Sequence, residues 1–252
     1  MRNLTREKLM RGEPALGCFV RQTDAGLTEL LALHGLDFVV FDGEHGTLTP
    51  QLCEHLVRAA ELHGVTPGVR VEENRAASIM RYLDAGALAC HVPGVESRED
   101  AIRAVRAVKF RPQGDRGLSA SRAARFGVAN DYPAYVAEAN RETLVIVHIE
   151  SAAGVDAAEE IATVEGIDVL LFGALDLSHD LGCPGEVENP RVQEAGGRIS
   201  AAAEAAGKSF GVVVGDAGKV PSCVEQGARY ILTTLESLIA PGVQSYVGAL
   251  RG

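Results

Sequence analysis

The sequence predicts an α/β protein with the architecture of a single-domain (β/α)8, or TIM, barrel spanning residues 1–252. Its 252 residues, 46% of them hydrophobic, suffice for one large core. Eight short apolar runs recur along the chain, and the segments between them have the apolar spacing of amphipathic helices. This alternation is typical of a parallel sheet, and eight strands favour a closed barrel over an open sheet of five or six strands with a glycine-rich first turn.

The predicted strands follow one another at fairly regular intervals. In chain order they are ALGCFV (15–20), DFVVF (37–41), PGVRV (67–71), LACHV (88–92), TLVIVHI (143–149), DVLLFG (168–173), SFGVVV (209–214) and YILTT (230–234). The segments 50–64 and 74–87 place apolar residues three and four positions apart and carry a glycine at their carboxyl ends. Both patterns predict helices that cover the barrel.

The interval between the fourth and fifth predicted strands, residues 93–142, is the longest and contains an insertion. The insertion is basic in an otherwise acidic chain. Its cationic residues are Lys109, Arg111, Arg116, Arg122 and Arg125. Two interpretations stay open: a solvated loop, or a loop that meets an anionic substrate or an acidic patch on another subunit.

Composition excludes several classes of function. A formal net charge of −10 and a pI of about 5.2 disfavour binding to nucleic acid or to anionic membranes. The five cysteines are odd in number and form no CxxC pair, which argues against disulfides and zinc. No segment has the length and apolarity of a signal peptide core or a membrane span. We therefore expect a soluble cytoplasmic protein.

Ionisable side chains occur where four of the predicted strands end. In chain order they are Asp42, Glu44, His45, Arg70, Glu150 and Asp176. Each has a structural explanation on its own, as a helix cap, an ion pair or a core histidine. The carboxyl ends of barrel strands meet at one face, however, and that face carries the chemistry of such barrels. Their shared position predicts a joint active site.

The residue types at this face indicate a particular chemistry. His148 and Glu150 lie two positions apart and so share a face of one strand. Glu150 and Asp176, completed by water, would form an oxygen site suited to Mg²⁺ or Mn²⁺, and Arg70 would neutralise an enolate. Such a site predicts aldolase chemistry on a 2-oxo acid without a lysine Schiff base. None of the four lysines, Lys8, Lys109, Lys208 and Lys219, ends a predicted strand.

Five segments carry a resemblance to a known family. They are DGEHGTLTP, GVRVEENRAASIMRYLDAGA, FRPQGDRGLSASRAARFG, VHIESAAGVDAAEEIATVEGID and LDLSHDLGCPGEVENPRVQEA. Together, over about residues 5–245, they resemble the HpcH/HpaI aldolase family of class II pyruvate aldolases. The resemblance implies a metal-dependent barrel, a homohexamer of dimers that swap a C-terminal helix, and cleavage of a 4-hydroxy-2-oxo acid to pyruvate and an aldehyde.

The resemblance also implies roles for individual residues. Glu150 and Asp176 match the metal ligands, for Mg²⁺ or Mn²⁺ with Co²⁺ as a further candidate, and Arg70 matches the enolate-stabilising arginine. His45 and Asp84 match a pair that acts through water as acid and base, and Asp42 matches an acid near the metal-bound water. Substrate contacts are predicted at Arg70, His148, Gly173 and Leu175.

Asp84 lies some ten helical residues, about 15 Å, from the start of its predicted helix, too far to reach its own His45. The dyad is therefore predicted to form across a subunit interface. Two positions also depart from many members of the family: His148 stands in place of Gln, and Ala174 in place of Pro. His148 is predicted to contact pyruvate, add a ligand or change the acceptor.

Two further functions stay open. One is a citrate synthase-like condensation of acetyl-CoA with oxaloacetate in siderophore biosynthesis, and the other is a non-catalytic barrel that binds an oxo acid.

Overall fold

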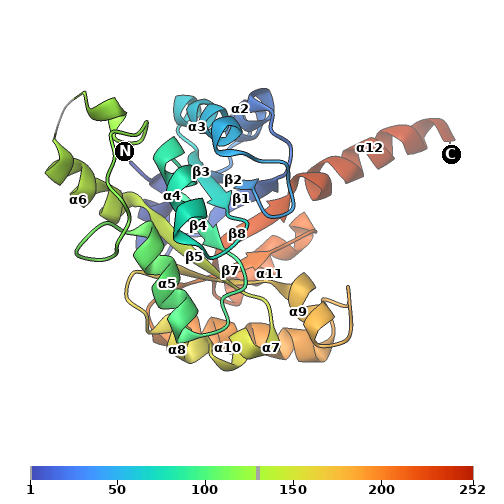
Figure 1. The fold of residues 1–252 in the computed structure, drawn as a ribbon. Helices are drawn as coiled ribbons and strands as arrows, with labels where there is room; N and C mark the ends of the chain where they lie inside the picture. Colours follow the sequence, from blue (N-terminus) through green and yellow to red (C-terminus); the bar gives the residue numbers. More distant parts are fainter. Residues whose placement is uncertain (1, 129–130, 252) are drawn as a thin grey trace.

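The computed structural model describes residues 2–128 and 131–251, and it places eight parallel strands in a closed barrel (Figure 1). The strands pair in chain order, and β8 closes the barrel against β1. Their bounds are β1 Ala15–Val20, β2 Phe38–Asp42, β3 Thr66–Arg70, β4 Ala89–Val92, β5 Leu144–Ile149, β6 Val169–Phe172, β7 Ser209–Val213 and β8 Ala228–Thr234. The predicted fold class is confirmed, and each strand overlaps its predicted run.

Helices connect the strands and cover the outside of the barrel (Figure 1). Their bounds are α1 Leu4–Met10, α2 Ala25–Leu33, α3 Pro50–His63, α4 Ala76–Ala85, α5 Arg98–Val108, α6 Tyr132–Glu142, α7 Ala152–Asp156, α8 Ala158–Ala162, α9 Ala174–Asp180, α10 Pro190–Ala205, α11 Val220–Glu225 and α12 Leu235–Arg251, with short 3₁₀ turns η1 at Arg125–Gly127 and η2 at Ala217–Lys219. The helix α3 shows how the sequence sets these bounds. Thr49 caps its first turn, Pro50 occupies the first helical position, and Gly64 ends it with a positive φ of 70°.

The side chains of the strands alternate between two hydrophobic layers. Phe38, Ile146 and Tyr230 belong to the cluster that fills the barrel interior. Their neighbours Val39 and Val147 belong to the cluster between the barrel and its helices. Both layers are apolar, so each strand is a nearly continuous apolar run, as buried parallel strands are.

Four of the five cations of the basic insertion have partners within the described chain, and one of them, Arg111 Nε, lies 4.0 Å from Asp115 Oδ1. The buried Lys109 amine donates hydrogen bonds to the backbone carbonyls of Asn140 (2.8 Å) and Thr143 (2.5 Å). Arg116 pairs with Asp84 at 2.8 Å, and Arg122 pairs with Glu61 at 2.5 Å. These contacts favour an insertion that is anchored to its own barrel.

The last helix, α12, leaves the barrel. Figure 1 shows it extending away from the other elements toward the C-terminus. Leu235, at its start, is 5% exposed, whereas Leu238, Val243, Tyr246 and Leu250 are 46%, 53%, 84% and 91% exposed. An apolar face of α12 therefore lies uncovered in the single chain. Within the described residues, no helix combines the length and apolarity that crossing a membrane requires.

Candidate active site

Asp42 and Arg70 form a buried ion pair at the carboxyl ends of β2 and β3. The strand register places the two residues side by side. Arg70 Nε donates to Asp42 Oδ1 at 2.9 Å, and Nη2 donates to Oδ2 at 2.5 Å. The Asp42 side chain is 0% exposed and that of Arg70 is 11% exposed. This two-pronged contact fixes the plane of the guanidinium at the end of the barrel.

Burial and pairing act in opposite directions on these two groups. Burial alone would raise the pKa of Asp42, but the hydrogen bonds and charge of Arg70 hold this pKa below its ordinary value. Burial would lower the pKa of Arg70, and the carboxylates of Asp42, Glu44 and Glu150 raise it instead. Both groups are therefore charged at neutral pH.

Glu44 and His45 follow β2 in a turn that Asp42 organises. Asp42 Oδ1 accepts hydrogen bonds from the backbone N–H groups of Glu44 (3.1 Å) and His45 (3.2 Å). Glu44 Oε2 lies 3.2 Å from Arg70 Nη1 and 3.8 Å from His45 Nε2. Burial raises the pKa of Glu44; the nearby carboxylate of Glu150 adds to this effect and Arg70 opposes it. His45 is the most exposed of these groups, with a side chain 55% exposed.

Glu150 lies just after β5 and is held at both carboxylate oxygens. Oε1 accepts a hydrogen bond from Gly94 N–H at 2.7 Å, and Oε2 lies 3.5 Å from His148 Nδ1. Burial would raise the pKa of Glu150, but His148, Gly94 N–H and Arg70 keep it below its ordinary value. A Cβ added at Gly173 would lie 2.9 Å from Oε2 and 2.5 Å from Glu150 Cβ, so glycine leaves open the space beside this carboxylate.

Asp176 and Leu175 lie in the first turn of α9, which follows β6. Both are exposed, Leu175 by 64%. In the described parts of the chain, Asp176 makes no hydrogen bond or ion pair, and no group of three or more His, Cys, Asp or Glu side chains forms a metal cluster. The ligands that the sequence predicts, Glu150 and Asp176, are two carboxylates. This set fits Mg²⁺ or Mn²⁺, which bind few side chains and keep water in their other positions.

Asp84 lies apart from this group. It is near the end of α4, paired with the buried Arg116, and its carbonyl accepts a hydrogen bond from Ala123 N–H. Among the described residues it makes no hydrogen bond or ion pair with His45.

Three residues that the sequence reasoning missed also approach the site. Arg21 Nε, just after β1, lies 3.6 Å from Asp42 Oδ2. Below Glu150, His91 on β4 and Tyr230 on β8 continue a polar chain into the barrel. The sequence contains one signal for His91. It lies two positions after Ala89 on the same strand, and His148 lies two positions after Ile146, so both histidines share a strand face with residues of the barrel interior.

These features define a class of protein. The chain is a (β/α)8 barrel with a buried guanidinium among carboxylates and histidines at the carboxyl ends of its strands. Such a site suits a small anionic ligand and the stabilisation of developing negative charge.

Comparison with known proteins identifies the family. Residues 15–239 match the model of the HpcH/HpaI aldolase/citrate lyase family. A 5-keto-4-deoxy-D-glucarate aldolase of Salmonella paratyphi C is 38% identical over 86% of this chain and 84% of its own length. A 2-keto-3-deoxy-L-rhamnonate aldolase of Klebsiella pneumoniae is 32% identical over 92% and 86%.

Solved structures support the same family. A family member from Burkholderia cenocepacia matches with a TM-score of 0.93 at 32% identity, covering 99% of this chain and 100% of that chain. The citrate synthase SbnG matches with a TM-score of 0.89 at 30% identity, covering 98% and 96%. The chain belongs to the HpcH/HpaI aldolase/citrate lyase family.

Proposed function

We propose that this protein is an aldolase that cleaves a 4-hydroxy-2-oxo acid to pyruvate and an aldehyde. The observation that carries the proposal is the buried Arg70, which Asp42 fixes at the end of the barrel. Its Nη1 lies beside the Glu44 carboxylate, and its charge helps to lower the pKa of Glu150. A fixed and largely buried cation stabilises an enolate more than a mobile, solvated one would. The relatives named as aldolases support the same reaction class.

The chain's own residues supply the steps around the bond that breaks. The His45 side chain is exposed at the mouth of the site, and it takes the proton of the C4 hydroxyl through a water. The C3–C4 bond then breaks, its electron pair passes to C3, and the aldehyde leaves. Arg70 balances the enolate charge until the proton taken by His45 returns through water to C3 and gives pyruvate. Substrate contacts at His148, Gly173 and Leu175 complete the proposal.

Glu150 and Asp176 are the residues that would hold a divalent metal, Mg²⁺ or Mn²⁺ before Co²⁺. The ion would supply positive charge that polarises the 2-oxo group of the substrate. Gly173 supports this assignment because it leaves space beside Glu150 Oε2. Asp42, engaged by Arg70, would orient nearby water rather than bind the ion.

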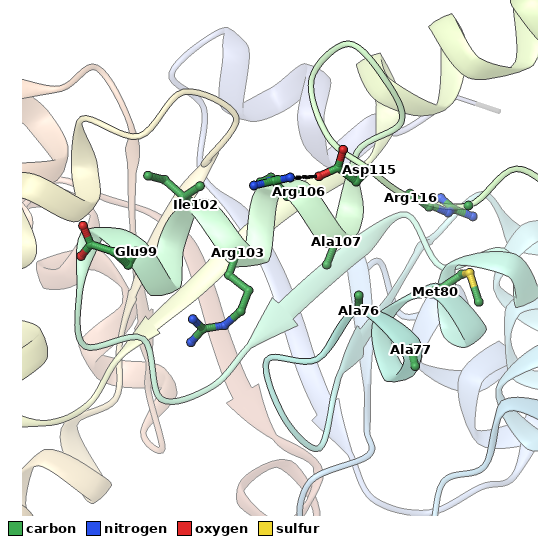
Figure 2. Close-up of a pocket in the computed structure, with 11 residues that line it drawn as sticks. Ala76, Ala77, Met80, Glu99, Ile102, Arg103, Arg106, Ala107, Asp115 and Arg116 are labelled. Carbon is green, nitrogen blue, oxygen red and sulfur yellow. Dashed lines mark hydrogen bonds and ion pairs between the residues drawn. The ribbon is translucent and has the colours of Figure 1, made fainter.

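We further propose that the protein works as a homohexamer built from dimers that exchange α12. The uncovered apolar face of α12 supports an exchange, because burying it against another copy removes it from water. Asp84 would then serve His45 of another subunit. A groove of about 700 Å³ between α4 and α5 lies beside its partner Arg116, and Figure 2 shows Arg116 and Met80 together at one end of it. This outward-facing surface is suited to a second copy.

The cell compartment that we propose is the cytoplasm, because all five cysteines are free thiols.

The test is a retro-aldol assay that detects pyruvate, run over a panel of 4-hydroxy-2-oxo acids. We expect turnover that EDTA abolishes and that Mn²⁺ or Mg²⁺ restores. Turnover that survives complete metal removal would overturn the metal assignment. Binding of pyruvate without turnover of any panel member would overturn the aldolase and favour a non-catalytic oxo-acid-binding barrel.

A separate observation favours a second candidate function. The match to the citrate synthase SbnG favours a condensation of acetyl-CoA with oxaloacetate, which also passes through an enolate. Release of free CoA thiol in the presence of both compounds, and not with either alone, would select this reaction.

A further inference from the structure

A chain of three polar side chains runs through the barrel interior below the candidate active site. His148 Nε2 lies 3.1 Å from His91 Nδ1, and His91 Nε2 lies 2.8 Å from the Tyr230 hydroxyl. His91 and Tyr230 are 0% exposed, and His148 is 2% exposed. Because this interior is otherwise apolar, the three groups satisfy one another's hydrogen bonds.

The surrounding aromatic rings hold these side chains in place. Phe38 stacks on Tyr230 with ring centroids 4.1 Å apart. Phe19 meets the edges of His91 and His148 at centroid distances of 5.6 and 6.3 Å. Burial lowers the pKa of His91, the charge of Arg70 adds to this effect, and burial raises the pKa of Tyr230. Both groups are therefore uncharged at neutral pH.

The carboxylate of Glu150 determines which atoms donate and which accept along these three side chains. It has only acceptor oxygens, and Oε2 lies 3.5 Å from His148 Nδ1, so a hydrogen on Nδ1 is favourable there and a lone pair is not. With its hydrogen on Nδ1, a neutral His148 has an acceptor at Nε2, and His91 must donate to it from Nδ1. His91 Nε2 is then an acceptor, and Tyr230 donates its hydroxyl hydrogen to it. With both rings neutral, one tautomer of each histidine satisfies every contact.

We infer that His91 and Tyr230 are positioning residues that lock His148 as its Nδ1–H tautomer and aim this hydrogen at Glu150. The Glu150 carboxylate is then held from two sides, by Gly94 N–H at Oε1 and by His148 at Oε2. Gly173 adjoins Oε2, where a Cβ would lie 2.9 Å from this oxygen. The consequence for catalysis rests on the proposed function, whereas the hydrogen arrangement does not depend on it.

Histidine tautomers can be measured directly. In protein labelled with ¹⁵N at histidine, two-bond ¹H–¹⁵N correlation spectra distinguish Nδ1–H, Nε2–H and doubly protonated rings, and single variants assign the seven histidines. Without substrate, the contacts predict that His91 and His148 each carry a hydrogen on Nδ1 and none on Nε2. An Nε2–H or doubly protonated form at either residue would overturn the inference, whatever the variants show.

Two substitutions of His91 distinguish a role in hydrogen bonding from a role in packing alone. In His91→Gln the side-chain amide still donates to His148 and still accepts from Tyr230, so His148 is expected to remain Nδ1–H. In His91→Leu both contacts disappear, and the His148 signal should change to mixed tautomers. The control Ile146→Val trims an apolar residue in register with His91 and should leave the signal unchanged. An unchanged His148 signal in His91→Leu would contradict the inference.

Turnover supplies a second readout. We expect His91→Leu to lower kcat roughly tenfold or more with a smaller change in KM, and His91→Gln to restore most of the loss. If His91→Leu and His91→Gln lose equal activity, the positioning role is wrong. A wild-type protein that shows the expected tautomers but no retro-aldol activity would overturn the proposed function and leave the hydrogen-bonded chain standing.

Discussion

Arg70 satisfies both oxygens of Asp42, whose side chain is fully buried. Replacing Arg70 with Met should therefore lower the free energy of unfolding by about 3 kcal/mol, because the buried carboxylate loses its main ion-pair partner and keeps only the more distant Arg21 and two backbone N–H groups. The double variant Asp42→Asn/Arg70→Met should recover much of this stability, since a neutral pair carries no unpaired charge. Urea unfolding of wild type, both single variants and the double variant measures the coupling free energy between Asp42 and Arg70. Additive losses of stability would contradict this coupling.

The same position tests the proposed chemistry. Arg70→Lys keeps the positive charge but loses the two-pronged contact with Asp42, so the cation is no longer fixed in one plane. We expect a fall in kcat of about 10²-fold or more in the retro-aldol assay, with a folded protein by circular dichroism. Activity within twofold of wild type would contradict the role of Arg70.

Asp42 also predicts a dependence of stability on acid. Arg70 holds the pKa of Asp42 below its ordinary value of 3.8, so the unfolded chain binds this proton more readily than the folded protein does. The stabilisation is present above pH 3.8 and is lost as the pH falls through the folded-state pKa. Melting temperatures measured from pH 6 to pH 2.5 should fall more steeply for wild type than for Asp42→Asn. Parallel curves would show that Asp42 titrates alike in both states.

At the scale of elements, the buried Asn3 connects the start of α1 to the N-terminal end of the barrel by hydrogen bonds. Its side-chain amide donates to the carbonyls of Leu88 (3.1 Å) and Glu142 (2.8 Å), and its Oδ1 accepts from Arg6 N–H (3.0 Å) at the start of α1. One residue thus caps a helix and satisfies the backbone near the starts of β4 and β5.

Asn3→Ala should lower the free energy of unfolding by about 2–3 kcal/mol, since it removes a cap and leaves buried carbonyls without a partner. The control is Asn189→Ala, which removes a less buried cap from α10 and should cost about 1 kcal/mol. Urea unfolding of both variants compares the losses, and equal losses would contradict the connecting role of Asn3.

The strands could be predicted from the sequence because each is a short apolar run buried on both faces, and only the ends shifted. Residues 230–234 were predicted as the last strand, and β8 begins two residues earlier at Ala228. Arg229 interrupts the apolar run there. It is part-buried and donates to backbone carbonyls of α11 and β8, a tertiary effect that periodicity does not contain.

The candidate site was predictable where polar residues end strands, as with Asp42, Arg70 and Glu150. It was not predictable where they lie inside apolar runs. His91 in LACHV and Tyr230 in YILTT resemble core residues, and their partnership joins β4 to β8, which are far apart in the chain. Only the closure of the barrel, which the sequence predicts as a class but without the positions of its side chains, brings them together.

For the molecule as a whole, α12 provides the first test of assembly. Removing residues 238–252 deletes its exposed apolar positions and keeps the buried Leu235. We expect the truncated chain to sediment as a smaller species than the full chain, and to remain folded because the barrel closes without α12. Identical sedimentation coefficients, after correction for mass, would exclude α12 from the interface.

The proposed dyad can be tested by mixing two inactive proteins. His45→Ala and Asp84→Ala should each lower kcat by about 10²-fold or more, because each removes one member of an acid–base pair. If His45 works with Asp84 of another subunit, chains exchanged in a 1:1 mixture form some intact sites. Half of the chains keep His45 and half of their neighbours keep Asp84, so about one quarter of wild-type activity should return. A dyad within one chain would leave no intact site in any mixture, and activity that stayed at the level of the single variants, with subunit exchange verified by mass spectrometry, would exclude the shared site.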